Sequence, residues 1–180
     1  MNRSAGGLGD ISLLVAYKLI DSSNETTHSA ISLRGQLKLP TGNSGYFFGS
    51  GGTDFAMFLS GSINYKSEWG TVGGYASAGV LVTSNGDILK NQRENITGFG
   101  NIGLGWSPFT WLGLKAQFDL NTQFYRNSSL PELGSGSAML TIGGSIKLPD
   151  NYIIDIGVSE DIAVSTAPDV SIFMGLSKKF

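Results

Sequence analysis

The sequence predicts an all-β protein, and within that class an antiparallel transmembrane β-barrel of about 8–10 strands. Three observations predict it: apolar and polar residues alternate along successive segments, these segments are long, and nearly all of their charges share one face. Alternation with a period of two is typical of a strand, because successive side chains leave opposite faces of a sheet. No stretch combines a 3.6-residue period with helix caps, so we expect no long helix.

Nine segments show this alternation and are assigned to one barrel domain over residues 1–180. In chain order, the predicted strands are 8–20, 28–40, 53–66, 71–83, 96–107, 112–125, 137–148, 152–160 and 169–180. Each is assigned from apolar residues two positions apart, which are, in the same order, Leu13 and Val15, Ile31 and Leu33, Met57 and Leu59, Val80 and Val82, Ile102 and Leu104, Leu112 and Leu114, Leu140 and Ile142, Ile154 and Ile156, and Met174 and Leu176.

The length of the segments favours a membrane wall. Most run to about 12–14 residues, whereas strands of soluble proteins usually have about 5–6 and a tilted strand needs about 9–11 to cross a bilayer. Strands this long leave extended apolar edges unless the sheet closes. Nine is an odd number, while bacterial single-chain barrels have even numbers. We therefore expect a tenth strand from residues 2–7 or from Tyr46–Ser50, or one segment outside the wall. The alternative is a truncated chain that closes irregularly or pairs with a second copy.

The placement of the charged residues indicates which face is which. Charged residues make up only 14% of the chain, whereas a soluble surface carries roughly a quarter to a third. A soluble barrel with its polar face outward remains the alternative, but this composition favours a polar lumen and an apolar exterior. Lys178 alone shares the apolar register. The charged residues predicted to face the lumen are Asp10, Lys18, Arg34, Lys38, Asp54, Lys66, Lys115, Asp119, Lys147, Asp155, Asp169 and Lys179.

Inside a narrow barrel these charges are expected to pair, because an unpaired buried charge is costly. Bulky residues share the lumen register, so we expect a largely filled lumen that could hold a small ligand with polar and apolar parts. The predicted function is a transport or channel-like protein for unknown small solutes. The alternative is a non-conducting structural or binding barrel whose loops or outer wall contact a partner. The bulky lumen residues are Phe58, Tyr75, Leu81, Phe99, Tyr125 and Phe173.

The links between segments alternate in length. Short turns at 67–70, 107–111 and 149–151 fall at one end, and longer links at 41–52, 84–95, 126–136 and 160–168 fall at the other, with the link 21–27 as the exception. Aromatic residues gather at the short-turn end, as in the interfacial girdle of a membrane barrel. The predicted girdle residues are Trp69, Trp106, Phe109, Trp111, Tyr152 and Phe180.

The last segment, Val170–Phe180, is amphipathic and ends in Phe, which resembles the C-terminal signature of bacterial outer-membrane barrels. GGLGD (6–10), KLPTG (38–42), GSGGTD (49–54) and SEDIAVSTAPDV (159–170) resemble an uncharacterised family of Gram-negative outer-membrane proteins. The resemblance implies a location in the bacterial outer membrane and recognition by the barrel assembly machinery through the last strand. It also implies that the chain is the C-terminal portion of a larger barrel, or a short version of one.

The outward face of two neighbouring segments carries unusually small residues, which would allow a second protein surface to approach closely. A homo-oligomer is the corresponding expectation, and a β-bulge or a strongly bent wall is the alternative. The small outward residues are Gly74, Ala76, Ala78, Gly98 and Gly100.

Other functions find little support. The net charge of −2 and the lack of a basic cluster argue against nucleic acid, and the chain has no Cys. His28 is the only His, and no GxSxG elbow accompanies it, so we expect no enzyme of the Ser–His–acid type. Glu160, Asp161 and Asp169 are the densest acidic group, but their spacing matches no calcium loop. We therefore expect no metal and no cofactor.

Overall fold

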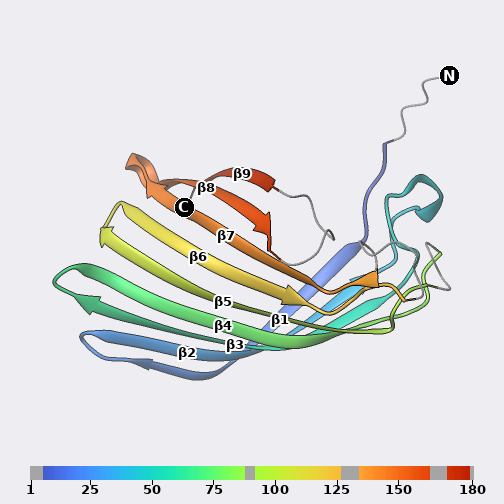
Figure 1. Ribbon diagram of the computed structural model, residues 1–180, viewed down its shortest axis with the longest axis horizontal. Coiled ribbons are helices and arrows are strands. Elements are labelled where there is room, and N and C mark those ends of the chain that lie inside the picture. Colours follow the sequence, from blue (N-terminus) through green and yellow to red (C-terminus); the bar gives the residue numbers. More distant parts are fainter. Residues whose placement is uncertain (1–5, 88–91, 127–133, 163–169, 179–180) are drawn as a thin grey trace.

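The computed structural model describes residues 6–87, 92–126, 134–162 and 170–178. Within these ranges nine strands form one antiparallel sheet, and their order in the sheet follows the chain (Figure 1). No helix in these ranges is long and apolar enough to cross a membrane. The strands are β1 (Ile11–Ser23), β2 (Thr27–Leu39), β3 (Asp54–Ser67), β4 (Gly70–Thr83), β5 (Ile96–Phe109), β6 (Leu112–Asn121), β7 (Ser137–Lys147), β8 (Tyr152–Asp161) and β9 (Val170–Lys178).

The predicted all-β, antiparallel class is confirmed. Each of the nine predicted segments contains a strand, because the alternation of apolar and polar residues fixes both the period and the face. As predicted, the short turns lie at the left of Figure 1, and the fully described longer link, between β2 and β3, lies at the right.

Strand β1 ends later in the chain than predicted, and this shortens the link 21–27, which was the exception to the predicted alternation of link lengths. It runs to Ser23 and not to residue 20, so the link to β2 contains only three residues, 24–26. Its pairing with β2 shifts register between Lys18 and Ile20, which leaves Leu19 as the extra residue of a bulge. A bulge interrupts the alternation, and the adjacent apolar pair Leu19–Ile20 is its trace in the sequence.

The sheet is not closed. Its order begins at β1 and ends at β9, and these two edge strands do not pair with each other. The predicted tenth strand is absent from the described residues: Gly6 and Gly7 are not in a strand, and Tyr46 ends a short 3-10 turn, η1 (Ser44–Tyr46). Residues 1–5 lie outside the described ranges. The alternation could not decide closure, because closure depends on the curvature accumulated over all the strands.

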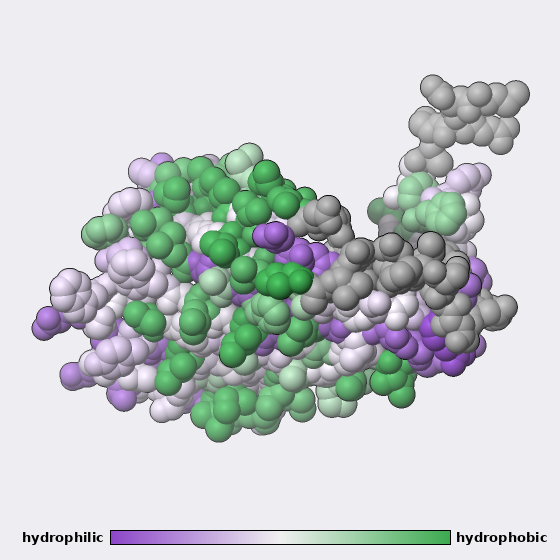
Figure 2. All heavy atoms as spheres, in the orientation of Figure 1, coloured by the Kyte–Doolittle hydropathy of each residue, from purple (hydrophilic) through white to green (hydrophobic). Residues whose placement is uncertain are grey.

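The sheet curves into a trough, with β8 and β9 rising at one side (Figure 1). Among the described residues, the only buried apolar side chains are Ala56 and Ala138. The large apolar residues instead stand exposed on the outer face, as Leu104 does at 66%. Figure 2 shows hydrophobic residues spread over the middle of the visible face and many of the hydrophilic ones at the two ends of the strands. The described part of the chain therefore has an apolar outer face and no central apolar core.

Candidate functional site: the polar concave face

Of the charged residues predicted to face the lumen, those in described strands lie on one face of the sheet. Cross-strand pairing places Lys38 opposite Asp54, Asn101 opposite Asp119, and Ser145 opposite Asp155. The same register puts Lys18, Arg34, Lys66, Lys115 and Lys147 on this face. Asp169 and Lys179 lie outside the described residues. We call this face the concave face.

A cluster of charged side chains lies at the end of the concave face where the long links are. Lys38 Nζ forms an ion pair with Asp54 and lies 3.4 Å from Asp10 Oδ2. Arg93 Nη2 donates to Asp54 Oδ1 at 3.0 Å, from the link between β4 and β5. Lys38 Nζ also donates to Ser50 Oγ at 2.6 Å. These contacts join strands β2 and β3 to both neighbouring links. Sequence reasoning missed Arg93, because a residue in a link has no register that assigns it to a face.

Asp10 anchors the start of β1 to the same cluster. The backbone N–H groups of Ser50 and Gly42 each donate to its carboxylate at 3.0 Å. These hydrogen bonds, the one from Ser50 first, lower the pKa of Asp10 below its ordinary value of 3.8, and Lys38 acts in the same direction. Hydrogen bonds to a carboxylate favour its charged form. Asp10 is therefore held as an anion that ties the link after β2 to the first strand.

The middle of the concave face holds a polar chain across β4 and β6. Tyr75 Oη donates to Gln117 Oε1 at 2.5 Å, and Gln117 Nε2 donates to the two oxygens of Asp119 at 2.8 and 2.9 Å. A Cβ at Gly103 of β5 would lie 2.2 Å from the Tyr75 ring. The absence of a side chain at Gly103 thus lets the tyrosine cross over β5 and reach β6.

The predicted pairing of the lumen charges is wrong for several lysines. At the short-turn end, Lys18 Nζ pairs with Asp21 at 2.5 Å, and His28 Nε2 lies 3.8 Å from the same carboxylate. Within the described part of the chain, Lys66, Lys115 and Lys147 form no ion pair. All three are exposed, so water on the open face solvates them and no partner is needed.

The predicted girdle residues that the structure describes lie around the short turns. Trp69 is 82% exposed, and its backbone carbonyl accepts a hydrogen bond from Trp106 Nε1 at 3.0 Å. Phe109 and Trp111 stack with ring centroids 5.6 Å apart. Lys178 Nζ lies 4.7 Å from the centre of the Tyr152 ring. Phe180 lies outside the described residues. Aromatic rings with polar tips at one end of a sheet are typical of a membrane interface.

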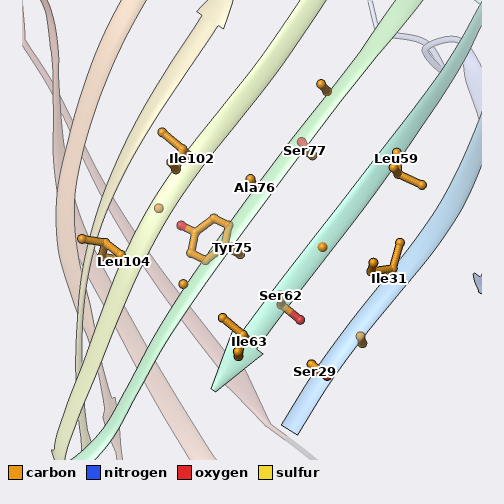
Figure 3. A pocket seen from close by; sticks show the side chains of 15 residues that line it. Ser29, Ile31, Leu59, Ser62, Ile63, Tyr75, Ala76, Ser77, Ile102 and Leu104 are labelled. Atoms are coloured by element: carbon orange, nitrogen blue, oxygen red, sulfur yellow. The ribbon is translucent and has the colours of Figure 1, made fainter. Parts of the chain in front are cut away.

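Three of the small outward residues, Gly74, Ala76 and Ala78, line a groove on the outer face, whereas Gly98 and Gly100 do not. Ala76 lies between the apolar side chains of Ile31 and Ile63 on one side and of Ile102 and Leu104 on the other (Figure 3). The hollow has a volume of about 670 Å³. It lies over β2 to β5, where the sequence predicts a close protein contact.

Metal chemistry finds no support in the described residues, where no group of three or more His, Asp or Glu side chains could hold an ion. Asp169, which belongs to the densest acidic group of the sequence, lies outside these ranges.

A comparison with known protein families gives a match over the whole chain. A family model described as "Protein of unknown function (DUF3187)" matches residues 1–180. No curated protein matches the chain.

Proposed function

We propose that this chain, which belongs to the DUF3187 family of proteins of unknown function, forms the wall of a transmembrane β-barrel in the bacterial outer membrane. In this proposal the barrel is a transport or channel-like protein for small solutes, and the concave face lines the solute path. The bilayer is its principal partner. The exposed strand β9 (Val170–Lys178) would be the element that the barrel assembly machinery recognises.

One observation carries the proposal: large apolar residues lie exposed along the outer face of nearly every strand, while the charged residues lie on the concave face. Exposing such a surface to water is unfavourable, because burying one Leu or Ile side chain contributes about 1.5–3 kcal/mol. Hydrocarbon is the environment in which this outer face is stable. The strands have 9 to 14 residues, which suits a tilted crossing of a bilayer.

In a membrane, the open edges of the sheet at β1 and β9 must pair with further strands. Unpaired backbone groups cost several kcal/mol each in hydrocarbon, so the edges of β1 and β9 must be covered there. With nine strands in an antiparallel order, β1 and β9 run in the same direction. Direct pairing between them would therefore be parallel. An antiparallel closure needs an odd number of additional strands between them.

Labelling two neighbouring residues of β3 tests the membrane assignment. The chain has no Cys, so Leu59→Cys and Ser60→Cys each create a single site for an environment-sensitive fluorophore. Leu59 faces outward and Ser60 faces the concave side. In vesicles that contain spin-labelled lipid, we expect strong quenching at position 59 and weak quenching at position 60. Equal quenching at both positions, or none, would overturn the proposal.

A non-conducting barrel is the second candidate, because bulky groups occupy the concave face. Phe58 and Phe99 pack edge to face with ring centroids 5.6 Å apart, and Phe173 covers Gly157. Single-channel recording on the protein in a planar bilayer distinguishes the two candidates. Steady ohmic steps would favour a channel, whereas a silent bilayer that contains inserted protein would favour a structural or binding barrel.

A further inference from the structure

We propose that the concave face contains a binding site for a small organic anion that carries hydroxyl groups, such as a sugar acid, with its carboxylate on Arg34. The proposal names the solute class for the face that the proposed function treats as a solute path, and it rests on that function only for this role. Binding itself requires neither conduction nor a bilayer.

Arg34 is the exception among the unpaired cations of the concave face. Unlike the exposed lysines, it is partly buried, and its Nε–H is buried without a hydrogen-bond partner. No carboxylate in the described ranges forms an ion pair with it. The guanidinium carbon lies 6.0 Å from the centre of the Phe58 ring. A partly buried cation without a counter-charge is costly, and a bound anion would remove that cost.

A row of small polar residues forms the floor of the cavity beside Arg34. Cross-strand pairing places Ser32 opposite Ser60, Ser60 opposite Ser77, and Ser77 opposite Asn101. The row therefore crosses β2 to β5 at one level, and Ser62 lies beside it. Among the described residues, the side chains of Ser32, Ser62, Ser77 and Asn101 form no hydrogen bond. Each can both donate and accept, which suits the hydroxyl groups of a ligand.

Two aromatic rings bound the cavity and are held in place. Phe58 packs against Phe99, and Tyr75 is oriented by its hydrogen bond to Gln117. The cavity between them has a volume of about 310 Å³. This lies at the lower end of the range for ligand pockets, about 300–1,000 Å³, and suits a molecule of the size of a monosaccharide.

The guanidinium, the polar floor and the two aromatic rings together indicate the class of ligand. A guanidinium recognises a carboxylate through two parallel hydrogen bonds, which fix its orientation. The polar floor would meet a hydroxylated body, and the ring faces would meet its C–H groups. Asp119 continues the row beyond Asn101 and is held by Gln117, so a second negative group at the far end of the ligand would be repelled. A monoanion with an uncharged, hydroxylated body fits these features best.

Titration calorimetry of the full chain in detergent tests the site, with glucuronate as the probe. We expect saturable binding of glucuronate, and binding of glucose at least tenfold weaker, because glucose lacks the carboxylate. Arg34→Gln should weaken glucuronate binding at least tenfold. The matched control is Lys66→Gln, which removes one positive charge from the same face outside the cavity and should change the affinity less than twofold.

A second variant separates the site from a general charge effect. Ser77→Leu keeps Arg34 and fills the floor of the cavity, so it should also weaken glucuronate binding at least tenfold. Circular dichroism of each variant verifies that the strands are retained. No binding by the wild-type chain, or equal effects of Arg34→Gln and Lys66→Gln, would overturn the proposal. Because all measurements are made in detergent, a failure of conduction or of bilayer insertion leaves this test unaffected and counts against the proposed function alone.

Discussion

Asp10 illustrates how a single residue can join segments distant in the sequence. It lies one position before β1 and accepts backbone hydrogen bonds from Gly42 and Ser50, while Lys38 lies 3.4 Å away. Asp54, which forms ion pairs with Lys38 and Arg93, completes the charged cluster at this end. The link after β2 contains two glycines that lie against it, since a Cβ at Gly49 would meet the Asp10 carboxylate. The long-link end is thus organised by one carboxylate and the backbone that surrounds it.

The lowered pKa of Asp10 predicts how stability depends on pH. Because its pKa in the folded chain lies below the ordinary 3.8, the carboxylate stabilises the fold above that pH, and this contribution is lost as the pH falls through the folded value. The Asp10→Asn variant lacks this stabilising contribution at every pH. We expect its deficit in the urea midpoint to be largest at about pH 6 and to shrink towards about pH 3. Asp150→Asn, in the exposed turn η2 (Pro149–Asn151), is the control. A deficit independent of pH would contradict the assignment.

At the scale of the elements, close contact between neighbouring strands depends on small residues. In β4, a Cβ at Gly79 would lie 2.3 Å from Phe58 Cβ and 2.4 Å from the backbone oxygen of Met57. The absence of a side chain at Gly79 leaves room for Phe58, whose ring reaches Phe99 in β5. The same arrangement recurs where Tyr75 covers Gly103. Glycines on neighbouring strands therefore leave room for the aromatic side chains of the concave face.

This packing predicts opposite effects for two glycine substitutions. Gly79→Ala should destabilise the chain by about 1–3 kcal/mol, because the added methyl group overlaps backbone atoms that cannot move freely. Gly35→Ala in β2 is the matched control, since its Cβ would meet nothing within 4 Å, and it should be neutral or stabilise by about 0.4–1 kcal/mol. Urea unfolding followed by circular dichroism measures both. A Gly79→Ala chain as stable as the control would show that β3 and β4 are not packed this closely.

At the scale of the whole molecule, the sheet has two unprotected edges. Every residue of β1 is exposed, on both of its faces, and β9 is nearly as open. An edge strand of this length offers a row of unpaired backbone groups. In water these groups are solvated, but in hydrocarbon they must pair. The proposed membrane location therefore requires additional strands, supplied by a second copy or by another chain segment.

Hydrogen exchange measures whether those edges are covered. In vesicles, the alternate amides of β1 that do not bond to β2 should be protected as strongly as those of β4, because the proposed wall is complete there. In detergent, where the edge can remain open, the same amides should exchange much faster than those of β4. Rapid exchange of these β1 amides in vesicles, with β4 protected, would contradict a closed wall in the membrane.

Much of this architecture follows from local pattern. The period-two alternation predicted nine strands close to their observed positions, and the register of the charges predicted which side chains share a face. These features depend only on neighbouring residues, since adjacent side chains of a strand must point to opposite sides. The bulge at Leu19 and the end of β6 at Asn121 were missed, because both depend on pairing with another strand.

Closure and the pairing of individual charges depended on the folded arrangement. Lys38, Asp54 and Arg93 meet because β2, β3 and a link converge. Arg34 carries a positive charge on the same face, but it forms no ion pair with any carboxylate of the described residues. Sequence register gives the direction of a side chain but not the distance to partners many residues away. Those distances are set by the curvature and twist that accumulate across the sheet, and the open edges between β1 and β9 have the same origin.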